Sequence, residues 1–261
     1  MSLGSPRNVF IYWSGFEYKL IKILRKIMYL HQNNGKGYKL FLITNENVTQ
    51  YLGDLPSCFY NLKLAHQADF VRVNVICNYG GIWLDSDTIV MDTLDSLFNI
   101  IENKNGFFVS RKDDNVTYDS ILSNGIFGSK PSTPIMIEWK NRINAVLEEK
   151  NENIGWTEIG SLILDDMYTN NSSLYDNYDI IYGKNNIYPI NWQNILEEFT
   201  EKPYENYVNI KRDWQPLIVL IGSVYRRLES KTEKEILREK TMPLNYFLLK
   251  SFDLLHSLNL D

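Results

Sequence analysis

Residues 78–87 read NYGGIWLDSD, and this stretch decides the fold. A helical run ends at the double glycine, because glycine tolerates the left-handed backbone that closes a helix. An apolar strand over 82–84 follows, and two carboxylates come directly after it, Asp85 and Asp87. If the strand continued, its two-residue period would place both carboxylates on one side. Two like charges so close are unfavourable without a cation between them, so the pair predicts a divalent metal site.

A divalent ion at Asp85 and Asp87 suits a nucleoside-diphosphate substrate. A nucleoside diphosphate leaves poorly until its charge is neutralised, and Mg²⁺ or Mn²⁺ held by oxygen ligands acts as the Lewis acid. One carboxylate would bind the ion directly, and the other would bind it through water or contact the ribose. The pair therefore predicts a nucleotide-sugar-dependent transferase.

Around this stretch, strands and helices alternate. Apolar runs and helical spacing predict a strand, helix, strand, helix, strand order over 9–13, 17–32, 38–43, 62–79 and 82–84. This order predicts an α/β fold with a mostly parallel central sheet flanked by helices, and ligands at the carboxyl ends of the strands. Further strands are expected at 106–110, 125–129 and 178–182. Further helices, including a helical C-terminal part, are expected at 134–150, 160–168, 232–240 and 244–258.

Composition narrows the class of protein. The net charge of −5 argues against a nucleic-acid partner, which would favour a basic surface. The two cysteines, Cys58 and Cys77, do not form the framework of a secreted disulfide protein. We see neither a signal peptide nor an apolar segment of membrane-spanning length. We therefore expect a cytoplasmic protein, with the inner face of the membrane as a further location.

Two other interpretations of the carboxylate pair stay open. Residues 82–89 also resemble the phosphoaspartate motif of haloacid-dehalogenase-type phosphatases, in which Asp85 would be the nucleophile and Asp87 the general acid. Asp165 and Asp166 would supply the distant acidic pair of that site. Against this, the phosphatase motif usually opens its domain, whereas here a βαβα unit precedes it. The third interpretation is a surface pair without a function.

Four blocks carry a resemblance to a known family. They are 9–15 (VFIYWSG), 68–72 (ADFVR), 79–87 (YGGIWLDSD) and 123–131 (SNGIFGSKP). Residues 8–150 resemble retaining glycosyltransferases with a DXD motif, namely glycosyltransferase family 32 and the capsular polysaccharide synthesis proteins. They are more distantly similar to the glucosylating domain of large bacterial cytotoxins. The resemblance implies a single GT-A domain over 1–261, with 8–150 binding nucleotide sugar and metal, and 151–261 forming the acceptor side and helical C-terminal part.

The resemblance also implies roles for individual residues. Asp85 and Asp87 would hold the metal, and Asp87 would be essential for catalysis. Tyr12, Trp13 and Ser14 would line the base pocket, with the Trp13 ring stacked on the nucleobase. Trp13 could equally be a core aromatic residue.

The resemblance places four more residues around the donor sugar. Asp69 would accept hydrogen bonds from sugar hydroxyls, and Arg72 would bind the sugar or a phosphate oxygen through its planar fork. A simple helical ion pair three residues apart is the alternative for these two. Trp83 would shape the pocket beside the metal. Asn124 would reach the transferred sugar, with a turn asparagine as its alternative.

Mechanism and substrates follow from the same resemblance. Retention without an identifiable carboxylate nucleophile predicts front-face substitution, with the metal and Arg72 stabilising the departing phosphate. The expected donor is a UDP- or GDP-hexose with Mn²⁺ or Mg²⁺, and the acceptor a polysaccharide, an oligosaccharide or a lipid-linked saccharide. A toxin-like transferase acting on a protein and a non-catalytic binding module are the alternatives. Candidates for a third metal ligand are Glu158, Asp213 and His256. The apolar run 244–255 favours packing on the main domain, with peripheral membrane contact as the alternative.

Overall fold

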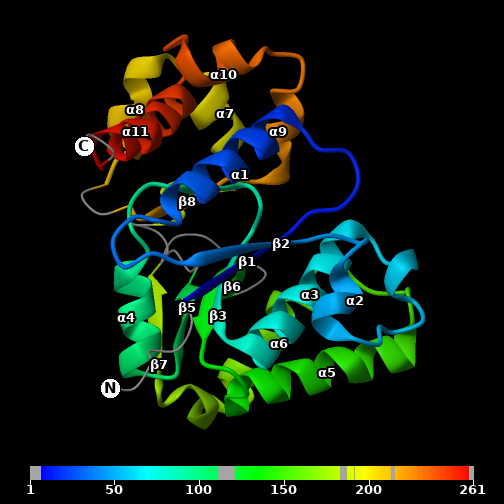
Figure 1. Cartoon of the computed structure of the whole chain (residues 1–261). Helices are drawn as coiled ribbons and strands as arrows, with labels where there is room; N and C mark the ends of the chain where they lie inside the picture. The colour runs from blue at the N-terminus through cyan, green and yellow to red at the C-terminus, as the bar shows by residue number, and fades with distance from the viewer. Residues whose placement is uncertain (1–6, 111–120, 183–186, 191, 213–214, 259–261) are drawn as a thin grey trace. The chain divides into compact units, whose positions relative to one another are not determined.

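The chain forms two compact units, each built from several segments (Figure 1). The computed structural model describes residues 7–110, 121–182, 187–190, 192–212 and 215–258. The first unit comprises Met1–Ser14, Lys39–Leu84 and Ser96–Tyr182, and the second comprises Gly15–Tyr38, Asp85–Asp95 and Gly183–Asp261. The chain thus passes from one unit to the other between Leu84 and Asp85. A single domain with a donor-binding part over 8–150 and an acceptor part over 151–261 stays a prediction.

The first unit contains a six-stranded sheet with the strand order β2-β1-β3-β6-β5-β7. β1, β2 and β3 are mutually parallel in the order 2-1-3, which confirms the predicted βαβαβ unit. β6 runs antiparallel to β3 and β5, and β7 is again parallel to β5. The strands are β1 (Asn8–Tyr12), β2 (Lys39–Ile43), β3 (Gly81–Leu84), β5 (Gly106–Ser110), β6 (Leu122–Ser129) and β7 (Tyr178–Tyr182).

Helix α3 (Leu64–Tyr79) is the central helix of the first unit and packs against β1, β3, β6 and α5. It ends at Gly80, which has a φ of 65°, as the double glycine predicted. Gly81 has a φ of 115°, and a Cβ there would lie 2.3 Å from the Asn8 carbonyl oxygen, so β3 can approach β1 only without a side chain. The other helices are α2 (Val48–Leu52), η1 (Phe59–Asn61), α4 (Asp95–Asn103), α5 (Pro134–Lys150), α6 (Ser161–Asn170) and η2 (Ser172–Tyr175).

The second unit is mainly helical, and its two short strands, β4 (Thr88–Val90) and β8 (Leu217–Val219), pair antiparallel. Leu244, Phe247 and Leu248 of the last helix are buried, so this part of its predicted apolar run packs inside the protein. In the described part of the chain, no helix is long and apolar enough to cross a membrane. The helices are α1 (Lys19–His31), α7 (Ile195–Thr200), η4 (Tyr204–Asn206), α8 (Tyr207–Ile210), α9 (Gly222–Arg227), α10 (Glu233–Arg238) and α11 (Pro243–Leu258).

His31, at the end of α1, is a buried histidine that joins three elements of the second unit. Asn34 Nδ2 donates to its Nδ1 at 3.0 Å, so we assign the proton to Nε2, which donates to the Ser251 carbonyl at 3.2 Å. Ser251 Oγ in turn donates to the Val90 carbonyl at 2.5 Å. Burial lowers the pKa of His31 to about 4, although the contact with Ser251 and the charge of Asp92 oppose this shift.

We expect acidification to destabilise the second unit through His31. The unfolded chain takes up this proton near pH 6.5 and the folded chain only near pH 4, so stability is full above pH 6.5 and falls between these values. The loss by pH 4 is at most about 3 kcal/mol. Urea unfolding of wild type and His31→Gln at pH 7, 5.5 and 4.5 measures this loss of stability. Glutamine can hydrogen-bond but does not titrate, so equal pH dependence in both proteins would contradict this role.

Candidate functional site

The two predicted metal carboxylates lie in a turn. Leu84 ends β3, and the Thr88 N–H donates to the Asp85 carbonyl at 3.1 Å, which closes a turn over residues 85–88. The predicted strand over 82–84 is confirmed as β3, and it ends before both aspartates, so the two-residue period of a strand does not relate their side chains. The chain leaves the six-stranded sheet at this point, because β4 pairs with β8 and not with a strand of the first unit.

The chemistry of this turn fits a divalent cation. The side chains of Asp85 and Asp87 are both half-buried and offer hard oxygen ligands. Among the described residues, no group of three or more His, Cys, Asp or Glu side chains is arranged to hold a metal ion. Mg²⁺ usually binds proteins through one or two carboxylates plus phosphates.

Of the three candidates for a third ligand, the structure describes one side chain, that of Glu158. It accepts a hydrogen bond from the Gly155 N–H at 2.8 Å and forms an ion pair with Lys150. The hydrogen bond from Lys150 is the largest cause of its lowered pKa. Glu158 therefore acts as a loop anchor. Asp213 and the His256 side chain lie outside the described residues.

Tyr225 is a neighbour of Asp87 that no sequence motif predicted. The Leu220 N–H donates to the Asp87 carbonyl at 2.9 Å, which brings the segment after β8 beside the turn. Burial raises the pKa of Tyr225, the adjacent Arg226 lowers it, and the charge of Asp87 raises it. The Tyr225 ring lies 4.8 Å from that of Tyr18. Two phenol rings, those of Tyr18 and Tyr225, therefore lie in the part of the second unit that holds Asp87.

Four other predicted site residues form one buried cluster in the first unit. Asn124 Nδ2, on β6, donates to Asp69 Oδ1 on α3 at 2.7 Å. Arg72 donates through Nη1 to the Asn124 carbonyl at 2.6 Å and through Nε to the Ala68 carbonyl at 3.2 Å. Its Nη2 lies 3.4 Å from Asp69 Oδ1, and its guanidinium carbon lies 5.2 Å from the Trp83 ring centroid. Residues of α3, β6 and β3 thus hold the Arg72 guanidinium in place.

Burial limits what this cluster can contact. Asp69 and Arg72 are each 6% exposed and Trp83 is 1% exposed, whereas Asn124 is half-buried. The ion pair between Asp69 and Arg72, which was the alternative interpretation for both residues, is present. Asn124 is therefore the most accessible member of the cluster.

The three predicted base-pocket residues follow one another at the end of β1. Tyr12 is buried, and its hydroxyl lies 2.5 Å from Asn45 Oδ1 and 2.7 Å from Gln67 Oε1, so its ring is part of the core. Trp13 and Ser14 are half-buried. The role of these residues in nucleotide binding stays a prediction, and Trp13 and Ser14 are the two with accessible surface.

Gly160 is a close neighbour of the cluster, and nothing in the sequence connected it with Asp69 or Asn124. It is the residue before α6, and a Cβ there would lie 2.6 Å from Asn124 Nδ2 and 3.1 Å from Asp69 Oδ1. The loop before α6 thus packs its backbone directly on the Asp69–Asn124 hydrogen bond. The glycine at position 160 is the feature of the sequence that could have indicated this close packing.

Gly160→Ala is expected to break the hydrogen bond between Asn124 and Asp69, because the new methyl group displaces the amide. We expect a loss of about 1–3 kcal/mol in the free energy of unfolding, measured by urea unfolding. Gly155→Ala, in the same loop, is the matched control, since its Cβ would lie at an ordinary 3.4 Å from Glu158 Oε2. Equal stability of the two variants would show that Gly160 is not tightly packed.

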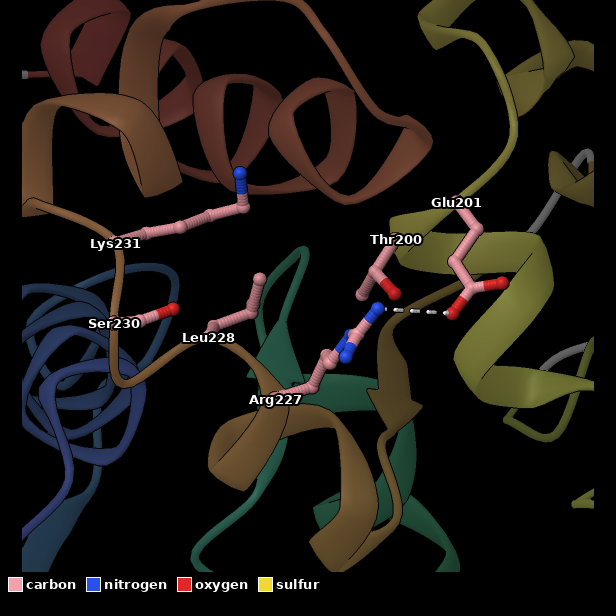
Figure 2. Close-up of a pocket in the computed structure, with 6 residues that line it drawn as sticks. All are labelled: Thr200, Glu201, Arg227, Leu228, Ser230 and Lys231. Carbon is pink, nitrogen blue, oxygen red and sulfur yellow. Dashed lines mark ion pairs between the residues drawn. The ribbon is translucent and has the colours of Figure 1, made fainter.

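A pocket in the second unit involves none of the predicted site residues. Its volume is about 300 Å³, and Figure 2 shows Arg227 facing Glu201 across it, at 3.7 Å between Nη2 and Oε1. Because its arginine already faces a carboxylate, we assign the pocket no part in the candidate site. The lining residues are Thr200, Glu201, Arg227, Leu228, Ser230 and Lys231.

Comparisons with known proteins agree with the predicted fold. The family model described as "Capsular polysaccharide synthesis protein" matches residues 2–219. No curated protein matches the chain. Among solved structures, glycosyltransferase GlyE of Streptococcus pneumoniae TIGR4 aligns at 12% identity and a TM-score of 0.51, covering 97% of this chain and 63% of GlyE.

Two more solved structures show the same likeness. A glycosyltransferase involved in glycosylation of the major capsid of PBCV-1 aligns at 12% identity and a TM-score of 0.50, covering 85% of this chain and 97% of that one. The bifunctional glycosyltransferase WbbM aligns at 14% identity and a TM-score of 0.51, covering 96% of this chain and 50% of WbbM. The chain thus spans about half to two thirds of GlyE and WbbM. The predicted α/β fold of GT-A type is confirmed.

Proposed function

We propose, since the chain belongs to the capsular polysaccharide synthesis protein family, that it is a metal-dependent retaining glycosyltransferase. It transfers a hexose from a UDP- or GDP-sugar to a polysaccharide, an oligosaccharide or a lipid-linked saccharide. The observation that carries this proposal is the turn of two half-buried carboxylates, Asp85 and Asp87, directly after the central strand β3. In an α/β sheet, ligands bind at the carboxyl ends of parallel strands. A cytoplasmic location belongs to the same proposal, whereas peripheral membrane contact does not, because Leu244, Phe247 and Leu248 of the apolar run are buried.

In this mechanism Asp85 and Asp87 would hold Mn²⁺ or Mg²⁺, and the bound ion would supply Lewis-acid chemistry for the departure of the nucleoside diphosphate. Trp13 and Ser14 bind the nucleobase. Asn124 contacts the transferred sugar, and its orientation is maintained by Asp69 and Arg72. These residues act by positioning and electrostatics.

The burial and the contacts of Asp69 favour front-face substitution. A double displacement with retention needs a carboxylate that can attack the anomeric carbon. Asp69 is the carboxylate of the buried cluster, but it is 6% exposed and its Oδ1 contacts both Asn124 and Arg72. It is therefore unsuited to act as a nucleophile.

The phosphatase alternative receives no support from its predicted acidic pair. Asp165 accepts hydrogen bonds from the Ile121 and Leu122 N–H groups at 2.6 and 2.9 Å. Asp166 forms an ion pair with Arg142. Both carboxylates thus hold α6 to its neighbours.

A panel of UDP- and GDP-hexoses tests the proposed function. We expect release of the nucleoside diphosphate from at least one donor in the presence of Mn²⁺ or Mg²⁺, and loss of this release in EDTA. Hydrolysis of an aryl phosphate that disappears in Asp85→Asn, without donor hydrolysis, would favour the phosphatase. Thermal protection by a nucleoside diphosphate without any hydrolysis would favour a binding module.

A further inference from the structure

Trp156 is the most exposed large hydrophobic residue in the described chain, with 69% of its surface accessible. Isolated apolar residues on a surface are common and need no explanation. Trp156 differs from them in its surroundings, which are a fixed loop, a buried polar atom without a partner and the Asp69–Asn124 pair.

The loop that carries Trp156 is anchored on both sides of it. Glu158 accepts a hydrogen bond from the Gly155 N–H and forms an ion pair with Lys150. Ile154 and Ile159 are buried at 8% and 0% exposure. The indole is therefore presented by a preformed backbone, and a ligand that binds it does not have to order the loop.

His66 supplies the second observation. Its ring centroid lies 6.2 Å from that of Trp156, and His66 itself is 1% exposed. Its Nε2 atom has no hydrogen-bond partner among the described residues. Buried polar atoms are rarely left unpaired, so this nitrogen indicates a buried water molecule. The buried imidazole supports the indole from the protein side, while most of the indole surface stays accessible.

The loop also leads directly to the proposed sugar-binding residues. Gly160, four residues after Trp156, packs on Asn124 Nδ2 and Asp69 Oδ1. Four residues span at most about 14 Å. Trp156 therefore lies within the reach of a short oligosaccharide from Asn124, the residue proposed to contact the transferred sugar.

We infer that Trp156 forms the stacking face of an acceptor subsite that binds a pyranose ring. The apolar C–H face of a sugar packs against an aromatic ring while its hydroxyls contact polar groups of the same loop, here Lys150 and Glu158. The inference of this subsite rests on the proposed function. It identifies the acceptor as a saccharide that has an accessible ring face. A protein acceptor without a sugar would not need it.

Saturation-transfer NMR tests the subsite with methyl α- and β-glycosides of glucose, galactose and mannose as probes. Wild type should transfer saturation to the ring protons of at least one probe. Trp156→Ala should reduce this signal at least tenfold, and Trp156→Phe should retain most of it. Trp192→Ala is the matched control, because Trp192 is another exposed tryptophan, at 53%, and should behave as wild type.

A second measurement separates the two claims. In wild type and Trp156→Ala, transfer to the bound probe and hydrolysis of the donor are compared, and the ratio of transfer to hydrolysis should fall at least tenfold in the variant. If wild type hydrolyses no donor, the proposed function fails. If it hydrolyses donor but binds none of the probes, or if Trp156→Ala binds them as wild type does, the subsite alone is overturned. Equal losses in Trp156→Ala and Trp192→Ala would also overturn it.

Discussion

Asp87→Asn is expected to lower kcat/KM for donor hydrolysis by about 10²–10³-fold. The amide keeps the shape of the side chain but removes the charge that binds the cation opposite the diphosphate. The turn itself should persist, because the hydrogen bonds that hold it, from Thr88 N–H to Asp85 and from Leu220 N–H to Asp87, involve backbone carbonyls. Initial rates of nucleoside-diphosphate release over a range of Mn²⁺ concentrations measure the effect.

Asp92→Asn provides the matched control for this prediction. Asp92 is exposed, lies in the same unit, and accepts a hydrogen bond from the Thr93 N–H at 2.7 Å. The same chemical change there should leave the rate within about twofold of wild type, since exposed polar substitutions have small effects. If Asp87→Asn retains the rate that Asp92→Asn shows, Asp87 has no part in the reaction.

Arg72→Ala is expected to reduce the free energy of unfolding by roughly 3–5 kcal/mol and to abolish most donor hydrolysis. The substitution leaves the Asp69 carboxylate buried without its cation and removes the donors to the Ala68 and Asn124 carbonyls. Denaturant unfolding and hydrolysis rates measure the two effects. Arg72→Lys keeps the charge but loses the planar fork, so it should recover part of the stability and little of the turnover.

Arg142→Ala is the control for the loss of an ion pair. Arg142 pairs with Glu138 and Asp166 at the surface of the same unit. Its loss should change the free energy of unfolding by about 1 kcal/mol or less. A loss of similar size in Arg72→Ala would show that the buried cluster is not held by its charge pair.

The sequence predicted those parts of the fold that depend on neighbouring residues. The Gly80–Gly81 pair marked the end of α3, and the parallel order of β1, β2 and β3 followed from their alternation with helices. Helix α4 was missed although Leu97, Phe98 and Ile101 have helical spacing and are buried. β4 and β8 have three residues each and are strands only because they pair across a long interval of chain.

Some residues of the candidate site could also be predicted from the sequence, and others could not. Asp69, Arg72 and Asn124 were named from motifs, and they do meet in one cluster. The packing around Asp69 and Asn124 could not be predicted, because it involves the backbone at Gly160, which lies far from both residues in the sequence. Tyr225 was missed because its nearness to Asp87 depends on the pairing of β4 with β8.

Anomalous diffraction from crystals grown with Mn²⁺ and a nucleoside diphosphate locates the proposed metal site. We expect one manganese peak within bonding distance of the Asp85 or Asp87 carboxylate, next to the diphosphate oxygens. A nucleotide bound elsewhere, or a manganese peak away from this turn, would contradict the proposed site.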